Sequence, residues 1–277
     1  MTLQMLVPVS TYPDGNAEGI AAHAATLGRH LQAEVHVLTL TAVFPSTRSA
    51  LGNLLLDVPA MVREVEAKCW QRGAAIVQAI EREVGGAGVT LRSDEIRCNP
   101  PLFGSAVAER ARYFDFTLVG IGGDEESSRP LAEAVIFGSG RPTLLVPEMN
   151  APTTLDHVMI AWDGSRVAAR AVHDSFEFLR RAKTVSIATV LGEKSLPDGL
   201  AERLSDYLAQ HDIRAKIAPV QNAGRPMAET LQSKAAEIGA GLLVMGAFGH
   251  SRVRDFVLGG ATAGILGDLQ VPVLLSH

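Results

Sequence analysis

The stretch from Leu242 to Thr262 decides the fold, and it reads Leu-Leu-Val-Met-Gly-Ala-Phe-Gly-His-Ser-Arg-Val-Arg-Asp-Phe-Val-Leu-Gly-Gly-Ala-Thr. Its first four residues form a short apolar run, of the length expected for a strand buried on both faces. Gly246 and Gly249 follow, and the pair Gly259 and Gly260 precedes small and apolar residues that suit the start of a helix. Glycine lets the backbone approach a ligand closely, and free N–H groups at a helix start attract an anion. The stretch therefore predicts a strand, a phosphate-binding loop and a helix N-terminus.

The glycine spacing differs from the two common nucleotide-binding loops, G-x-G-x-x-G and G-x-x-x-x-G-K-[ST]. Gly-x2-Gly-x9-Gly followed by a small residue resembles instead the nucleotide-binding signature of the universal stress protein (UspA) family. The resemblance implies a Rossmann-like α/β fold with five parallel strands, and a site that holds the ribose and phosphates of ATP. One residue departs from the family pattern: Gly260 stands where serine or threonine is usual, so a hydroxyl donor to phosphate is missing, although Thr262 lies nearby.

The composition limits the classes of protein to which the chain can belong. Its 277 residues suffice for one large domain or two of ordinary size. With 47% hydrophobic and 20% charged residues, it is expected to bury a core and stay soluble. The net charge of -5 gives no basic surface for nucleic acid. No run approaches the roughly 18 apolar residues of a membrane span, and the N-terminal residues lack the basic start of a signal peptide, so we expect a cytoplasmic protein.

No residue cluster predicts a metal or catalytic centre. Cys69 and Cys98 fit neither a metal-binding spacing nor a disulfide framework, and we expect small buried side chains in a reducing compartment. The eight histidines show no H-E-x-x-H spacing. Neither Ser139 nor Ser251 has the flanking residues of a nucleophile elbow, and no general base is paired with a nucleophile. We therefore expect no enzyme activity beyond slow ATP hydrolysis, for which phosphate and metal would already be positioned.

The chain repeats itself once, at about half its length. Apolar runs of the first half have partners in the same order in the second, namely Met5–Ser10 with Val158–Asp163, Glu34–Leu40 with Thr184–Val190, Phe116–Gly120 with Leu242–Gly246, and Arg141–Val146 with Val271–Leu275. Helical patterns lie between these runs, and such alternation implies parallel strands joined by right-handed crossovers. We predict two α/β domains of five parallel strands each, residues 1–150 and 151–277, joined by a short linker at Glu148–Asp156.

An amphipathic helix is predicted after the first strand of each half, with Asn16 and Ser165 as the N-caps. The apolar faces are formed by Ile20, Ala24, Leu27 and Leu31 in the first half and by Ala168, Val172, Phe176 and Leu179 in the second. The first half also carries an extra segment at 44–60, followed by a long helical stretch to about Glu83.

The resemblance also implies the strand order 3-2-1-4-5, which places a ligand at the C-terminal ends of the first and fourth strands. In the second half these strands end at Asp163 and Gly246, so the acid and the glycine signature are expected to face one crevice. The family's matching acid contacts the adenosine moiety, and its backbone at the position of Val190 contacts adenine. The predicted nucleotide-binding residues are Asp163, Val190, Met245, Gly246, Gly249, His250, Gly259, Gly260, Ala261 and Thr262. Plainer structural interpretations stay open: a turn at Asp163, core packing at Met245 and Val190, and an exposed loop at His250.

The first half is predicted to have lost the site. Ser10 stands where the second half has Asp163, and no second glycine pair follows Gly122 and Gly123. The acidic run 124–126 comes next instead and would repel phosphate.

The predicted function is binding of an adenine nucleotide (ATP, ADP or AMP) by the second domain, with magnesium held mainly by phosphate oxygens and water. The resemblance implies a regulatory or stress-response role and a homodimer formed through edge strands. Two alternatives stay open. One is a non-catalytic interaction module with vestigial nucleotide sites, which Gly260 favours. The other is a sensor of a different small ligand, such as a lipid or a cyclic nucleotide, held between the domains.

Overall fold

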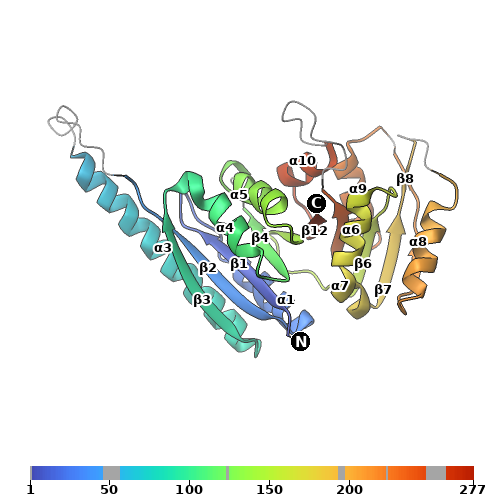
Figure 1. Ribbon diagram of the computed structural model, residues 1–277, viewed down its shortest axis with the longest axis horizontal. Helices are drawn as coiled ribbons and strands as arrows, with labels where there is room; N and C mark the ends of the chain where they lie inside the picture. Colours follow the sequence, from blue (N-terminus) through green and yellow to red (C-terminus); the bar gives the residue numbers. More distant parts are fainter. Residues whose placement is uncertain (1, 46–56, 123–124, 193–196, 223, 248–259) are drawn as a thin grey trace.

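The computed structural model describes residues 2–45, 57–122, 125–192, 197–222, 224–247 and 260–277, and its two halves lie side by side (Figure 1). The strands of the first half are β1 (Gln4–Ser10), β2 (Glu34–Ala42), β3 (Leu91–Cys98), β4 (Phe116–Ile121) and β5 (Thr143–Pro147). Those of the second half are β6 (His157–Ala161), β7 (Thr184–Ala188), β8 (Val190–Leu191), β9 (Ala215–Ile217), β10 (Val220–Gln221), β11 (Leu242–Gly246) and β12 (Val273–Ser276). The α-helices are α1 (Gly19–Leu31), α3 (Val58–Gly86), α4 (Phe103–Ala111), α5 (Glu125–Gly138), α6 (Arg166–Asp174), α7 (Phe176–Arg181), α8 (Leu200–Ala209), α9 (Met227–Glu237) and α10 (Gly260–Gly267).

A ten-stranded sheet runs through both halves, in the order β3-β2-β1-β4-β5-β12-β11-β6-β7-β9. Every strand pair within a half is parallel, as expected for strands joined by helical crossovers. Read from its outer edge, each half has the order 3-2-1-4-5. The predicted fold of two tandem five-stranded units is therefore confirmed. The boundary at 150/151 lies between β5 and β6 and stays a prediction.

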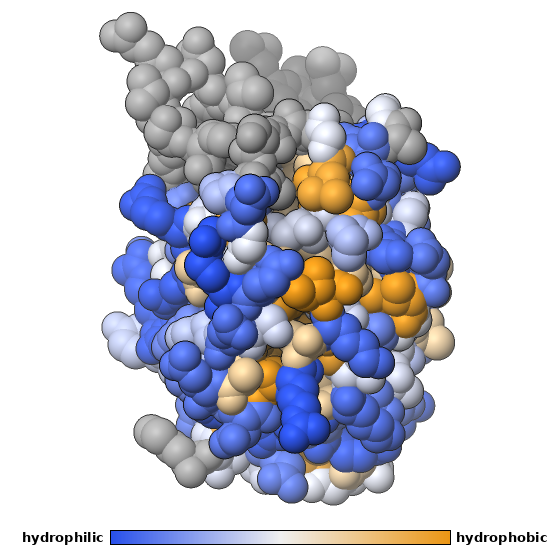
Figure 2. Space-filling view, turned by 90° about the vertical axis from the view of Figure 1, so that its right-hand side faces the viewer, coloured by the Kyte–Doolittle hydropathy of each residue, from blue (hydrophilic) through white to orange (hydrophobic). Residues whose placement is uncertain are grey.

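The core consists of two apolar layers, one on each face of the sheet. One layer packs β-strand residues such as Val7 and Val244 against α1, α3, α6, α7 and α8. The other packs residues such as Leu6 and Met245 against α4, α5, α9 and α10. Both layers contain residues of both halves. The outer face of the second half is mainly hydrophilic, with apolar residues in small separate areas (Figure 2).

The two halves meet through their fifth strands. β5 and β12 pair antiparallel, with Leu144 opposite Leu274. Phe116 and Phe178 pack edge to face across the halves, with ring centroids 5.6 Å apart. Such aromatic pairs stabilise a contact beyond the area they bury. The fifth-strand edges of the two units are thus joined within one chain.

Some sequence-based expectations need correction. Ser165 caps α6 as predicted, because its hydroxyl oxygen accepts from the N–H of Ala168 at 3.2 Å. The prediction for Asn16 is wrong, because Glu18 is the N-cap of α1. The side-chain oxygen of Asn16 accepts a hydrogen bond from the N–H of Ser10 instead. The single helical face predicted for the second half spans two helices, because α6 ends before Ser175 and α7 begins after it.

The buried His23 of α1 fixes the start of the linker between the halves. It is 3% exposed, and its Nε2 lies 3.1 Å from the carbonyl oxygens of both Pro147 and Asn150. Two carbonyl partners require a proton on Nε2, so His23 donates to both. Burial lowers the pKa of His23, because the imidazolium is poorly solvated there.

We expect His23→Gln to make the free energy of unfolding less sensitive to acid. In the wild type, the stability that neutral His23 contributes is fully present above the unfolded pKa of about 6.5 and is lost as the pH falls from there through the lower folded pKa. For this one group, the free energy of unfolding changes by at most about 1.4 kcal/mol per pH unit. Glutamine offers two N–H groups to the two carbonyls but does not titrate. Urea unfolding at a series of pH values measures the difference, with the exposed His173→Gln as the control. Equal slopes for wild type and His23→Gln would contradict it.

Candidate functional site

In each half the strand order reverses at the C-terminal ends of the first and fourth strands, the place where a crevice forms in such sheets. In the first half β1 and β4 are neighbours, and in the second half β6 and β11 are. In open parallel sheets the helices that follow two such strands leave on opposite faces, which opens room for a ligand between them. Both crevices are therefore candidate sites.

Gly246 ends β11 directly beneath the first turn of α6. A Cβ on this residue would be 2.6 Å from the backbone N of Ala168 and 2.6 Å from the carbonyl carbon of Val167. Glycine is thus required here by helix packing, whether or not a ligand binds. The first signature glycine has a structural role that the sequence analysis did not predict.

Asp163 lies two residues beyond β6, on an exposed turn before α6. Its Oδ1 accepts from the N–H of Ser165 at 2.9 Å. This is the turn-forming role that the sequence left open beside ligand binding. The other carboxylate oxygen, Oδ2, takes no part in this hydrogen bond. The turn is therefore compatible with a ligand contact by Asp163.

The other described residues of the predicted site differ in exposure. Met245 is 5% exposed and belongs to the core layer under α9 and α10. Val190 lies in β8 beside Val220 of β10, after the end of β7, so it does not end the second strand as predicted. Thr262 is 2% exposed in α10, and Ala261 is half-buried against the same core. Core packing therefore accounts for the position of Met245.

Gly260 is the first residue of α10 and is exposed. A Cβ on this residue would meet no atom of the described chain within 4 Å. No described residue would therefore obstruct the serine or threonine that the resembling signature usually carries at this position. Gly249, His250 and Gly259 lie outside the described residues.

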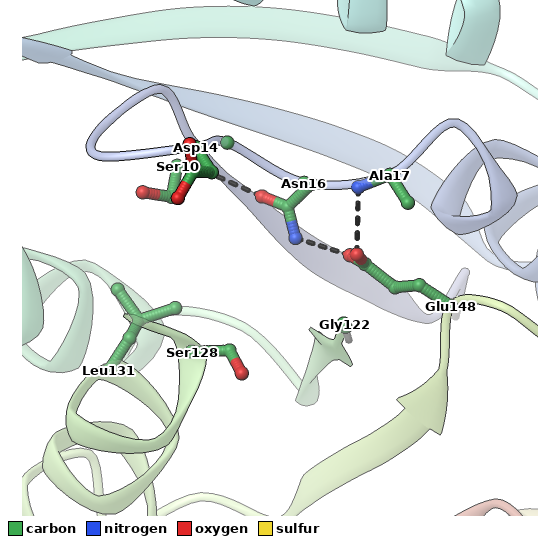
Figure 3. A pocket seen from close by; sticks show the side chains of 10 residues that line it. Ser10, Asp14, Asn16, Ala17, Gly122, Ser128, Leu131 and Glu148 are labelled. Carbon is green, nitrogen blue, oxygen red and sulfur yellow. Dashed lines mark hydrogen bonds between the residues drawn. The ribbon is translucent and has the colours of Figure 1, made fainter. Parts of the chain in front are cut away.

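The first-half crevice contains a cavity of about 290 Å³ (Figure 3). It is lined by Ser10 from the end of β1, Asp14–Ala17 from the following loop, Gly120 and Gly122 from the end of β4, Ser128 and Leu131 from α5, and Glu148. Asp14 and Glu148 are the charged residues among these, so the lining is acidic. A polyphosphate would be repelled, which supports the prediction that this half has lost its nucleotide site.

Glu148 was missed by the sequence analysis, where it counted only as the start of the linker. It is 4% exposed, and burial raises the pKa of its carboxyl group, while the hydrogen bonds from Ala17 and Asn16 lower it. No sequence pattern points to it, because its partners lie more than 130 residues away. The side chains of the acidic run 124–126, which the prediction invoked, lie outside the described part.

Neither a metal centre nor a membrane span emerges from the described residues. Within the ranges given above, no three histidine, cysteine, aspartate or glutamate side chains are grouped so that they could hold a metal ion. None of the helices described is both long and apolar enough to cross a membrane.

A model of the universal stress protein family matches residues 154–277. Among solved structures, a universal stress protein from Archaeoglobus fulgidus DSM 4304 matches with a TM-score of 0.71 at 16% identity, over 99% of this chain and 97% of that chain. A putative universal stress protein from Pseudomonas aeruginosa UCBPP-PA14 matches with a TM-score of 0.62 at 14% identity, over 99% and 93%. A universal stress protein in complex with cAMP matches 44% of this chain and 97% of that chain, with a TM-score of 0.34 at 23% identity. The search of curated proteins finds no significant match.

The family match covers the half that carries the glycine signature, and the full-length matches extend the fold to the other half. The sheet order 3-2-1-4-5 occurs once in each half. Residues 154–277 therefore belong to the universal stress protein family, and the whole chain is a tandem repeat of its fold.

Proposed function

We propose that the second half binds an adenine nucleotide and that the protein has a regulatory role, with at most slow ATP hydrolysis. The observation that carries the proposal is the position of the signature: its first glycine, Gly246, ends β11 beside the reversal point, and Gly260, which follows its third glycine, begins α10. Phosphates would lie near the start of α10, because the backbone N–H groups of a helix's first turn can donate to an anion. The ribose would lie toward Asp163.

A panel of ATP, ADP, AMP and cyclic AMP in a thermal-shift experiment tests the proposal. A ligand at 100 times its Kd should add about 2.7 kcal/mol to the free energy of unfolding. We expect at least one of the four to raise the melting temperature and GTP to have a smaller effect. Ultraviolet spectroscopy of the denatured protein then shows whether a nucleotide is carried through purification. The absence of any shift across the panel would contradict the proposal.

A non-catalytic interaction module is the second candidate function. Gly260 favours it, because the missing hydroxyl removes one donor to phosphate, and so do the structural roles of Gly246 and Met245. A sensor of another small ligand held between the halves is the third, but the interface there is formed by paired strands and packed aromatic rings. Loss of all nucleotide effects in the panel would favour the module.

We also expect a homodimer in the cytoplasm. The fifth strands are already paired within the chain, so a second copy would have to use other surfaces, such as the outer strands β3 and β9. Sedimentation equilibrium measures the mass in solution, and a monomer at all concentrations would contradict the expectation.

A further inference from the structure

Glu148 occupies the first-half crevice in the manner of a bound anion (Figure 3). One carboxylate oxygen accepts from Nδ2 of Asn16, and the other accepts from the backbone N–H of Ala17 at 2.8 Å. The amide of Asn16 is held in one orientation, because its Oδ1 accepts from the N–H of Ser10 at 2.7 Å. Two donors of fixed direction therefore converge on one carboxylate.

The backbone also fits this carboxylate closely. The N–H of Glu148 donates to the carbonyl oxygen of Ile121 at 3.0 Å, so its main chain extends the end of β4. A Cβ on Gly120 would overlap the carboxylate, and a Cβ on Gly122 would be 3.2 Å from its Oε2. Both glycines thus permit the close approach of a carboxylate, as glycines do for a ligand in a binding loop.

Space filling alone does not account for an acid at this position. A leucine or methionine would fill the crevice without the cost of removing a charge from water. Among the described residues that line the cavity, none is a cation that could offset that cost. The two N–H donors offset part of this desolvation cost, because hydrogen bonds to a charged group are stronger than those between neutral groups. The donors and the carboxylate therefore form a matched set.

We propose that Asn16 and Ala17 form an anion site for a single carboxylate group in the first half, and that the chain closes this site with its own Glu148. The carboxylate of Asp14 lines the same cavity and adds a second negative charge, so the site takes a monocarboxylate and rejects a phosphate dianion. The first half is then barred from nucleotide binding by occupancy as well as by its missing glycines. This inference does not depend on nucleotide binding by the second half.

Rescue of the full-length Glu148→Ala variant by acetate tests the proposal. The substitution leaves the two donors without an acceptor beside an enlarged cavity, so the variant should melt at a lower temperature than the wild type. Sodium acetate should restore much of this loss at neutral pH, compared with sodium chloride at equal ionic strength. Isothermal titration should then give one acetate per chain. The wild type should show no such acetate effect, and equal effects on both proteins would overturn the proposal.

The double variant Asn16→Ala, Glu148→Ala is the matched control. Loss of one hydrogen bond to a charged group should weaken acetate binding about tenfold or more. Unchanged acetate affinity in the double variant would show that acetate binds elsewhere. AMP should bind Glu148→Ala with no more equivalents than it binds the wild type. An additional equivalent in the variant would show that the crevice is a nucleotide site and overturn the assignment of a monocarboxylate.

A second measurement keeps Glu148 in place, so it can be made even if the Glu148→Ala variant does not fold. Asn16→Ala alone removes one donor from the Glu148 carboxylate, which should raise the pKa of that group further, because the hydrogen bond favours its charged form. Carbon-13 NMR of the glutamate carboxyl signals follows this titration, with Glu148→Gln used to assign the signal. An unchanged titration would contradict the matched-set argument.

Discussion

Gly246→Ala is expected to lower the free energy of unfolding by about 3 kcal/mol, the upper end of what overpacking usually costs. The added Cβ would be 2.6 Å from two backbone atoms of α6, and a backbone cannot move aside as a flexible side chain can. The first turn of α6 would have to lift from the end of β11, which separates part of the core beneath it. Urea unfolding followed by circular dichroism measures the change.

Gly260→Ala is the control within the same glycine signature. A Cβ at this position meets nothing within 4 Å in the described chain, so the free energy of unfolding should change by less than about 0.5 kcal/mol. A similar loss from both variants would mean that the contact with α6 is not the reason Gly246 is needed. The comparison separates a glycine that packing requires from one that packing leaves open.

Gly260→Glu should weaken nucleotide binding by two to three orders of magnitude while the protein stays folded. Two like charges about 4 Å apart repel by about 4 kcal/mol at an effective dielectric constant of 20. The new carboxylate would lie at the start of α10, where the proposed site holds phosphate. The same carboxylate interacts favourably with the N-terminal end of the helix, so the free energy of unfolding should not fall. Titration calorimetry with the nucleotide that gives the largest thermal shift measures the loss.

Gly267→Glu provides the matched control at the other end of α10. It adds the same charge to the same helix, and a Cβ there also meets nothing within 4 Å in the described chain. It should cost about 0.3–1 kcal/mol of stability, because a negative charge is unfavourable at a helix C-terminus, and leave the affinity nearly unchanged. Equal loss of affinity from both variants would place the phosphates away from the start of α10.

The two reversal points of the sheet differ in what the described residues place there. In the second half α10 begins at the exposed Gly260, where a Cβ would meet no described atom within 4 Å. In the first half the corresponding crevice holds Glu148. The predicted loss of the first site was attributed to missing glycines and an acidic run. The described structure adds a different cause, a carboxylate that comes from the linker.

Local patterns in the sequence determined much of the fold. Buried central strands such as β4 and β11 are continuous apolar runs, and α1 shows its buried face at helical spacing. The repeat of these patterns gave two units, and the resemblance of the glycine signature gave their strand order. The signature also located the candidate site, because a ligand loop depends on residues close together in the chain.

The third strands could not be placed in this way. β3 lies at an edge of the sheet with most of its side chains exposed, so it lacks the apolar run of a central strand. β9 is only three residues long. The prediction of five strands per half requires a third strand in each, but neither β3 nor β9 has a local pattern that fixes its residues.

Tertiary structure alone decided how the halves join and what fills the first crevice. β5 pairs antiparallel with β12, and both strands are buried apolar runs. The sequence of such a run does not specify which strand it pairs with. Glu148 meets Ala17 across 131 residues of chain, and Gly246 meets a helix that follows a different strand. Sequence spacing reports contacts within an element or a loop, whereas these contacts exist only once the sheet has assembled.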